Sequence, residues 1–269
     1  MDEHPTEPGF NPEDNRPSKQ QWILIAVVAL IAVCGLLLFL SGGVLTAYSW
    51  YSEQQAEAIE TAAAATEVVV ARDQAMIAAS EWPVLLFDTF DDNRNDWIDG
   101  EIDDQYAAIH VTINGVYQWE TSAKQGFHWR VWPESDLVSD FYLAVDAQNI
   151  GDNVDAQYGL IFRENNDSYF YWEVSDTQYY RLFSYQGDWI ELIPSTFTEA
   201  LQPGALNHLV VVAENDVFKL WINDQFVGQT SGSIPSKGQA GIAVGLSYPG
   251  EESVIIFDNF ELRALSSEQ

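Results

Sequence analysis

Residues 158–193, YGLIFRENNDSYFYWEVSDTQYYRLFSYQGDWIELI, decide the fold of this chain. They form four short segments rich in aromatic and β-branched residues, which favour strands. Three polar turn sequences separate them: Glu164-Asn165-Asn166-Asp167, Asp176-Thr177-Gln178 and Gln186-Gly187-Asp188. The pattern predicts an antiparallel meander of four strands.

The second turn sets the register of the meander. If Asp176-Thr177-Gln178 is a three-residue turn, Glu173 lies opposite Arg181 and alternation sorts the side chains onto two faces. The expected core face holds Phe170, Trp172, Val174, Leu182, Ile190 and Leu192. The other face holds Tyr169, Tyr171, Glu173, Tyr179, Arg181, Tyr185, Trp189 and Glu191, and Arg163 can join it from the preceding strand. A four-residue loop would place Trp172 next to Arg181 instead.

The second face has two interpretations. Rings with charged groups between them can stack on sugar rings and hydrogen-bond their hydroxyls, which favours a carbohydrate-binding surface. In the alternative, the rings only fill a two-sheet sandwich, and Glu173 and Arg181 form an ion pair at its rim.

From Val84 onward the apolar period is two, and about a dozen short strands with turns between them predict an all-β antiparallel two-sheet sandwich, or jelly roll. Outside the meander we expect strands at 85–90, 106–112, 116–120, 127–131, 141–146, 208–213, 218–222, 226–229, 240–245 and 254–262. Asn223-Asp224 is the signal of a two-residue hairpin.

The N-terminal residues predict a membrane anchor. Residues 1–20 are polar and aperiodic, which predicts a disordered tail. Residues 21–50 carry no charge and exceed the roughly 20 apolar residues that cross a bilayer, so we predict a transmembrane helix there. A cleaved secretory signal peptide is the alternative, although its apolar region is usually only about 7 to 15 residues long.

Basic residues set the predicted orientation. Arg16 and Lys19 precede the span, and the first basic residue after it is Arg72, so the N-terminus is expected in the cytoplasm and the remainder outside the cell. Residues 51–82 lack Gly and Pro and favour a solvated helical stalk. The predicted β domain covers 83–265, and a short tail follows at 266–269.

The composition excludes one class of partner. The formal net charge is −30 at pH 7, and no basic stripe interrupts it. Such a field repels nucleic acid. The single cysteine, Cys34, lies in the apolar run, so the β domain has no disulfide, and a domain of this size buries enough apolar surface without one.

Six stretches carry a family resemblance. They read LLFDTFDDNRNDW, YGLIFRENNDSYFYWEV, YYRLFSYQGDWIEL, NHLVVVAENDVFKLWINDQFVG, GQAGIAVGL and VIIFDNFEL, and together they cover roughly Leu85 to Leu262. This pattern resembles the concanavalin A-like lectin/glucanase superfamily, in particular its laminin G-like and keto-disaccharide hydrolase-like jelly-roll domains. The resemblance implies that a glycan is bound or cleaved on the concave sheet. It also implies that Arg163 and the strand from Tyr171 to Glu173 face that side.

The catalytic signature of the superfamily is incomplete here. Its glucanases carry Glu-x-Asp-x-x-Glu on one strand, so that two carboxyl groups flank the scissile bond. Residues 101–106 begin this pattern but place Tyr106 where the second Glu belongs, and we interpret them as a solvated loop. Glu173 and Glu191 could form a carboxylate pair, although spacing does not fix their separation. The strand histidines, His110, His128 and His208, show no zinc-ligand spacing.

Calcium is a further hypothesis. Residues 91–96 begin like a calcium loop, but Asp96 replaces the required Gly, which excludes an EF-hand. A jelly-roll Ca²⁺ site can still be formed by Asp88, Asp91 or Asp92 with Asp258, because the first and last strands of such sandwiches pair. The alternative is a set of Asx-turn residues on an acidic surface.

These observations predict a single-pass membrane protein that displays a carbohydrate-binding module outside the cell. The expected ligand is an extracellular glycan, and the predicted ligand-binding residues are Arg163, Tyr169, Tyr171, Glu173, Tyr179, Arg181 and Trp189. Two alternatives stay open. A glycoside hydrolase or lyase of the same fold needs two converging acids, and a structural adhesion module that binds protein needs an exposed apolar patch.

Overall fold

The computed structural model describes residues 70–133 and 136–265, together with 26–27, 30–31, 54–55, 58 and 61. The chain divides into two units, Met1–Val69 and Val70–Gln269. Within the described residues, no helix is both long and apolar enough to cross a bilayer. The helix predicted over 21–50 lies outside the described residues except at 26–27 and 30–31, and the tails predicted at 1–20 and 266–269 lie wholly outside them, so these stay predictions.

The second unit is an all-β sandwich with one helix in its described part. Its strands are β1 (Val84–Asp88), β2 (Gly100–Asp103), β3 (Ala107–Ile113), β4 (Tyr117–Ala123), β5 (Phe127–Val131), β6 (Phe141–Asn149), β7 (Gln157–Asn165), β8 (Ser168–Ser175), β9 (Tyr179–Tyr185), β10 (Trp189–Phe197), β11 (Asn207–Glu214), β12 (Val217–Ile222), β13 (Gln225–Ser231), β14 (Gln239–Leu246) and β15 (Glu252–Arg263). All pairings between them are antiparallel, as predicted.

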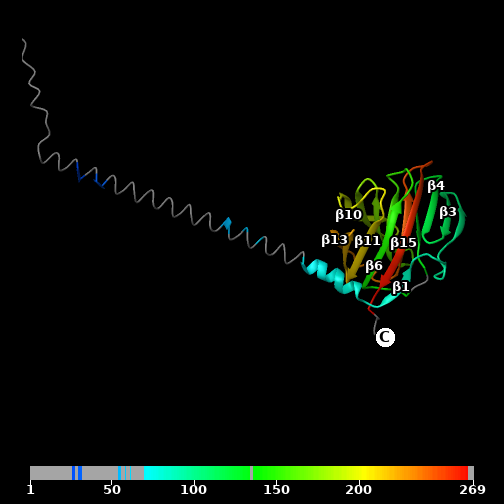
Figure 1. Cartoon of the computed structure of the whole chain (residues 1–269), viewed down its shortest axis with the longest axis horizontal. Helices are drawn as coiled ribbons and strands as arrows, with labels where there is room; N and C mark the ends of the chain where they lie inside the picture. The colour runs from blue at the N-terminus through cyan, green and yellow to red at the C-terminus, as the bar shows by residue number, and fades with distance from the viewer. Residues whose placement is uncertain are drawn as a thin grey trace, which may run out of the picture. The chain divides into compact units, whose positions relative to one another are not determined.

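The strands form two sheets. The nine-stranded sheet runs in the order β13-β12-β11-β6-β15-β4-β3-β2, with β1 paired to β15. Figure 1 shows β11, β6, β15 and β4 side by side in this sheet. The six-stranded sheet runs in the order β10-β9-β8-β7-β14-β5. Between them lies one core of alternate residues from both sheets, including Trp119 and Phe141 from the larger sheet and Trp172 from the smaller. Burial of such rings is the main stabilising term, at about 25 cal/mol per Å².

The predicted meander is confirmed, and of the two registers left open the structure has the one with the three-residue loop. Glu173 pairs with Arg181 across the three-residue loop, and Gln178 closes that loop with φ of 65°. The predicted hairpin at Asn223-Asp224 is also present, with φ of 50° and 62°. Two successive left-handed residues suit the twist of a two-residue hairpin, and Asn and Asp tolerate this conformation better than most side chains.

Two local predictions are wrong. Gly100–Asp103 is a strand, β2, because its backbone pairs with β3, although its sequence is polar enough to suggest a loop. Ile190, predicted in the core, is 50% exposed. It lies on the edge strand β10, where pairing with β9 is irregular after Glu191, and no further strand covers it.

The helix at 70–80 packs on the outer face of the nine-stranded sheet. Ala79 is buried there against a patch that includes Tyr142, Val210 and Trp221. The guanidinium of Arg72 lies 4.1 Å from the ring centroid of Phe226. This part of the predicted stalk is therefore not a solvated helix, since its apolar face is buried on the sheet. The compact unit begins at Val70, before the boundary predicted at residue 83.

Replacing Ala79 with Glu tests this docking. A carboxylate cannot be buried without a partner, so we expect the helix to detach while the sandwich stays folded. Hydrogen exchange should then accelerate selectively in residues 70–80. Ile77→Glu is the matched control, because Ile77 is exposed on the same helix. Unchanged protection in Ala79→Glu would contradict the docking.

Candidate functional site

The outer face of the six-stranded sheet gathers the residues that the meander predicts. Alternation turns Tyr169, Tyr171 and Glu173 of β8 away from the core that holds Trp172. Across the register, Tyr169 pairs with Tyr185, Tyr171 with Phe183, and Glu173 with Arg181. The edge strand adds Trp189, which pairs with Tyr185.

This outer face is a deep trough. His128 belongs to β5 at one edge of the sheet and Trp189 to β10 at the other, yet their ring centroids are 5.8 Å apart. In a flat sheet, strands five places apart would be separated by about 24 Å, at about 4.8 Å per strand. The sheet must therefore curve so that side chains from its two edges lean together over its middle.

Part of the floor of the trough is made of residues with little or no side chain. Pairing places Gly159 between Ala243 and Glu173, and Gly245 between His128 and Gln157. A Cβ at Gly245 would lie 2.5 Å from Cδ2 of His128. The absence of side chains at these positions gives the surrounding rings room to converge.

Much of the predicted aromatic platform is covered. Tyr171 is 2% exposed and Tyr169 is 4% exposed, so neither ring offers an open face. Tyr169 stacks on Tyr185 at 5.2 Å between centroids, and the guanidinium of Arg130 lies 4.5 Å from the Tyr169 centroid. The prediction that these two tyrosines are exposed rings is therefore corrected: both are buried, and Tyr171 lines the bottom of one hollow.

The rings that remain accessible stand higher on the walls. Tyr179 is 43% exposed, Trp189 46% and Tyr248 69%. Tyr179 and Tyr248 line one hollow of the trough, and Trp189 lines the other. These three rings, rather than Tyr169 and Tyr171, can contact a flat apolar surface of a ligand.

Glu173 lies at the centre of the trough. Its side chain is only 3% exposed and forms an ion pair with Arg181 through Oε1. Its Oε2 lies 3.5 Å from Nε2 of His128. Burial raises the pKa of Tyr171 well above its usual value, and the negative charge of Glu173 adds to the shift. The Tyr171 hydroxyl therefore stays protonated at neutral pH.

Two hollows meet at this ion pair. One, of about 250 Å³, is lined by His128, Tyr171, Glu173, Arg181, Phe183, Trp189 and Ser247. The other, of about 430 Å³, is lined by Asp155, Gln157, Glu173, Val174, Ser175, Thr177, Tyr179, Tyr180, Arg181, Ser195, Ser247, Tyr248 and Glu251. The larger lies within the range of roughly 300–1,000 Å³ that small-ligand sites span. Because both share Glu173, Arg181 and Ser247, one extended ligand can occupy them together.

Arg163 does not join this face. Its residue is 1% exposed, and its guanidinium donates to the carbonyl oxygens of Ser139, Asn215 and Gly232. It also lies 4.9 Å from the ring centroid of Phe218, a core residue. The pairing of β7 with β8 is irregular after Phe162, which breaks the alternation on which the prediction depends. Arg163 therefore ties loops of the sandwich together.

Sequence reasoning missed several residues of the trough. His128 reaches it from β5, Gln157 from the start of β7, and Tyr248 from the loop after β14. Only long-range strand order brings these segments together, so no local signal could find them. Phe183 could have been found, since it alternates with Arg181 on the same strand. Glu191 pairs with Phe183 on the edge strand and lines neither hollow, so the suggested acid pair with Glu173 is not formed there.

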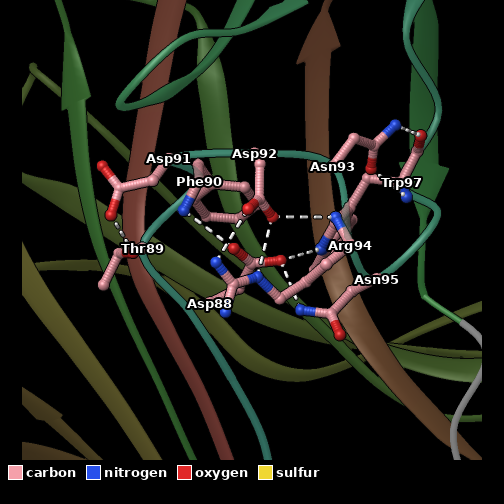
Figure 2. Close-up of polar contacts among 9 residues, drawn as sticks. All are labelled: Asp88, Thr89, Phe90, Asp91, Asp92, Asn93, Arg94, Asn95 and Trp97. Atoms are coloured by element: carbon pink, nitrogen blue, oxygen red, sulfur yellow. Dashed lines mark hydrogen bonds and ion pairs between the residues drawn. The ribbon is translucent and has the colours of Figure 1, made fainter.

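The acidic loop after β1 is held by its own hydrogen bonds. Figure 2 shows Asp88 among three donors: Oδ1 accepts from the backbone N–H of Phe90 at 2.7 Å, and Oδ2 accepts from Nδ2 of Asn95 at 2.6 Å and Nε1 of Trp97 at 2.9 Å. Asp92 pairs instead with Arg94, and Asp91 accepts from the hydroxyl of Thr89. This is the Asx-turn alternative for Asp88.

The predicted calcium ligands are not gathered into one cluster. Within the described residues, no group of three or more His, Cys, Asp or Glu side chains is arranged to hold a metal. Asp258 lies on β15, which pairs with β1 as predicted. Burial raises the pKa of Asp258, and the charges of Asp146, Asp91 and Asp88 add to the shift. Calcium binding stays a prediction.

The other two histidines in the described part of the chain pair with single acids on the nine-stranded sheet. Nδ1 of His208 lies 2.6 Å from Oδ1 of Asp146, and the hydrogen bond raises the pKa of His208. Nδ1 of His110 lies 2.7 Å from Oε1 of Glu101.

Comparison with known proteins gives a likeness of fold. No family model matches the chain, and no curated protein matches it. Among solved structures, it is similar to the carbohydrate binding module CBM66 from Bacillus subtilis, with 18% identity, a TM-score of 0.46, and coverage of 67% of this chain and 97% of that one.

Two glycoside hydrolase structures give similar sequence identities and TM-scores. The catalytic domain of an endo-1,3-β-glucanase (laminarinase) from Thermotoga petrophila has 12% identity, a TM-score of 0.48, and coverage of 70% of this chain and 99% of that one. A GH43 protein from Bacillus licheniformis has 12% identity, a TM-score of 0.49, and coverage of 66% of this chain but 39% of that one. Function is therefore inferred from the trough itself.

A pair of tryptophans distinguishes the trough from the core. Trp172→Ala should lower the free energy of unfolding by about 3–5 kcal/mol, because it empties a fully buried site. Trp189→Ala should cost less than half as much, because that ring is half exposed. Urea denaturation of both variants measures the difference, and equal losses would show that Trp189 is a core residue.

The Asp88 loop gives a second test. Asp88→Ala leaves three donors without their acceptor and should lower the free energy of unfolding by about 2 kcal/mol or more. Asp92→Ala is the control and should have little effect, because that side chain is exposed.

A melting temperature that rises when calcium is added to the wild-type chain would support the calcium hypothesis, and an unchanged one would contradict it.

Proposed function

We propose that this domain binds a glycan in the trough of its six-stranded sheet. The observation that carries the proposal is the combination of exposed rings on the walls with buried polar groups on the floor. Tyr179, Trp189 and Tyr248 can stack on the apolar C–H side of a sugar ring. Glu173, Arg181 and Gln157 can hydrogen-bond the hydroxyls at its rim.

The shape of the trough supports an oligosaccharide rather than a single sugar. The two hollows share Glu173, Arg181 and Ser247 in their linings, and each has at least one accessible ring of its own. We also propose that the domain is displayed outside the cell. This second proposal is supported only by the sequence, through the uncharged residues 21–50 and the basic residues that precede them.

Truncation of the exposed rings tests the proposal. In a glycan array probed with the full chain, Tyr179→Ala and Trp189→Ala should each weaken binding by about 2- to 10-fold, the contribution of one ring contact. Tyr106→Ala removes an exposed ring that lines neither hollow and serves as the control. Absence of binding to every glycan by the wild-type chain would overturn the proposal.

A further inference from the structure

In the part of the chain that the structure describes, two acceptors at the bottom of the trough have no hydrogen bond, although two donors lie in the smaller hollow beside Glu173: Nε2 of His128, at 3.5 Å from Oε2, and the unpartnered hydroxyl of Tyr171. Among the described residues, neither Oε2 of Glu173 nor Oε1 of Gln157 has a hydrogen-bond partner, although both atoms are buried. The orientation of the Gln157 amide is set by its other end. Nε2 donates to the carbonyl oxygen of Asp155 and lies 3.3 Å from Oγ of Ser247. Because a carbonyl can only accept, the nitrogen must face it, and Oε1 is left as a free acceptor.

A buried acceptor without a partner is costly, by about 1–3 kcal/mol for a neutral group and more for a charged one. Glu173 and Gln157 come from β8 and β7, and both flank Gly159, which has no side chain to separate them. Both residues line the larger hollow. A ligand that donates hydrogen bonds to both would satisfy two acceptors with one group.

The charged residues around the larger hollow also favour a ligand with donor groups and positive charge. Its lining holds three carboxylates, those of Asp155, Glu173 and Glu251, and one guanidinium, that of Arg181. Arg181 is already paired with Glu173. Glu251 accepts from the backbone N–H groups of Ser247 and Tyr248. The hollow therefore favours a cation over an anion.

We propose that the sugar bound in this trough carries a free amino group, as an unacetylated hexosamine does. The inference rests on the proposed function and specifies its ligand. An ammonium group brings three donors, no acceptor and a positive charge, which complement Oε2 of Glu173 and Oε1 of Gln157. N-acetylation removes the charge and adds a carbonyl acceptor. A sulfate or uronate would bring negative charge toward the acidic lining.

Matched oligosaccharides test the inference. Titration calorimetry of the full chain at physiological ionic strength should compare a β-1,4-linked glucosamine trisaccharide with its fully N-acetylated form and with the glucose trisaccharide. We expect the amino sugar to bind at least about 10-fold more tightly than either. Glu173→Gln should abolish this preference, and Gln157→Met should reduce it. Glu120→Gln removes one exposed carboxylate from the nine-stranded sheet and should leave the preference unchanged.

The outcomes separate the two proposals. Equal or tighter binding of the acetylated or neutral trisaccharide would overturn the amino-group inference and leave glycan binding intact. If Glu120→Gln weakens binding as much as Glu173→Gln, the preference reflects general charge attraction, and the inference is again overturned. No binding of any glycan, in calorimetry or on the array, would overturn both. Should Glu173→Gln fail to fold in a thermal melt, Gln157→Met decides the outcome.

Discussion

The convergence of side chains over a patch of β7 and β14 with almost no side chains is the constraint on which the trough depends. Gly159, Ala243 and Gly245 leave adjoining positions of β7 and β14 almost bare. Rings from distant strands fill that space, so that His128 lies 5.5 Å from Tyr171 between centroids. The close approach of β7 to β8 has the same requirement, since a Cβ at Gly159 would lie 2.1 Å from the carbonyl oxygen of Trp172. Larger residues there would flatten the sheet or push its walls apart.

This packing gives the six-stranded sheet two buried faces. Its inner face contributes to the sandwich core, and its outer face carries a second cluster built on Ile161, Tyr169, Tyr171 and Ala243. A sheet buried on both sides loses the simple contrast of apolar inside and polar outside. Only the rings farthest from the floor reach solvent, and these are the ones available to a ligand.

The ion pair of Glu173 and Arg181 is limited by the cost of burying a carboxylate. Removing a carboxylate from water costs several kcal/mol, and a single partner repays this only in part. Glu173 is paired through one oxygen, while its second oxygen stays buried without a hydrogen bond among the described residues. Such an arrangement is poor for stability and well suited to recognition, because a ligand can supply the missing donor. The outer face of the nine-stranded sheet is different, because helix 70–80 covers part of it.

The sequence by itself determined the strands and turns of the meander and limited its register to two alternatives. Period two, the three-residue loop at 176–178 and the Asn223-Asp224 hairpin are local signals, because backbone geometry fixes the side-chain direction and turn residues fix the loop. One of these two alternatives placed Glu173 opposite Arg181, as the structure does. The local signals also placed Tyr169 and Tyr171 on the outer face, but not beneath other side chains. Burial on that face depends on curvature, which comes from small residues on β7 and β14 and from rings on β5.

Only the tertiary structure decided which side chains share the trough. His128, Gln157 and Tyr248 come from segments far apart in the chain, and strand order across the sheet brings them to Glu173. Arg163 does not lie on this face, because the irregular pairing of β7 with β8 interrupts the alternation of side chains after Phe162. The helix at 70–80 packs on the larger sheet because that sheet has an apolar outer patch, a feature that helix propensity cannot reveal. Local periodicity specifies the face to which each side chain points. The burial of a side chain, and its proximity to residues of other strands, depend on how the two sheets are assembled.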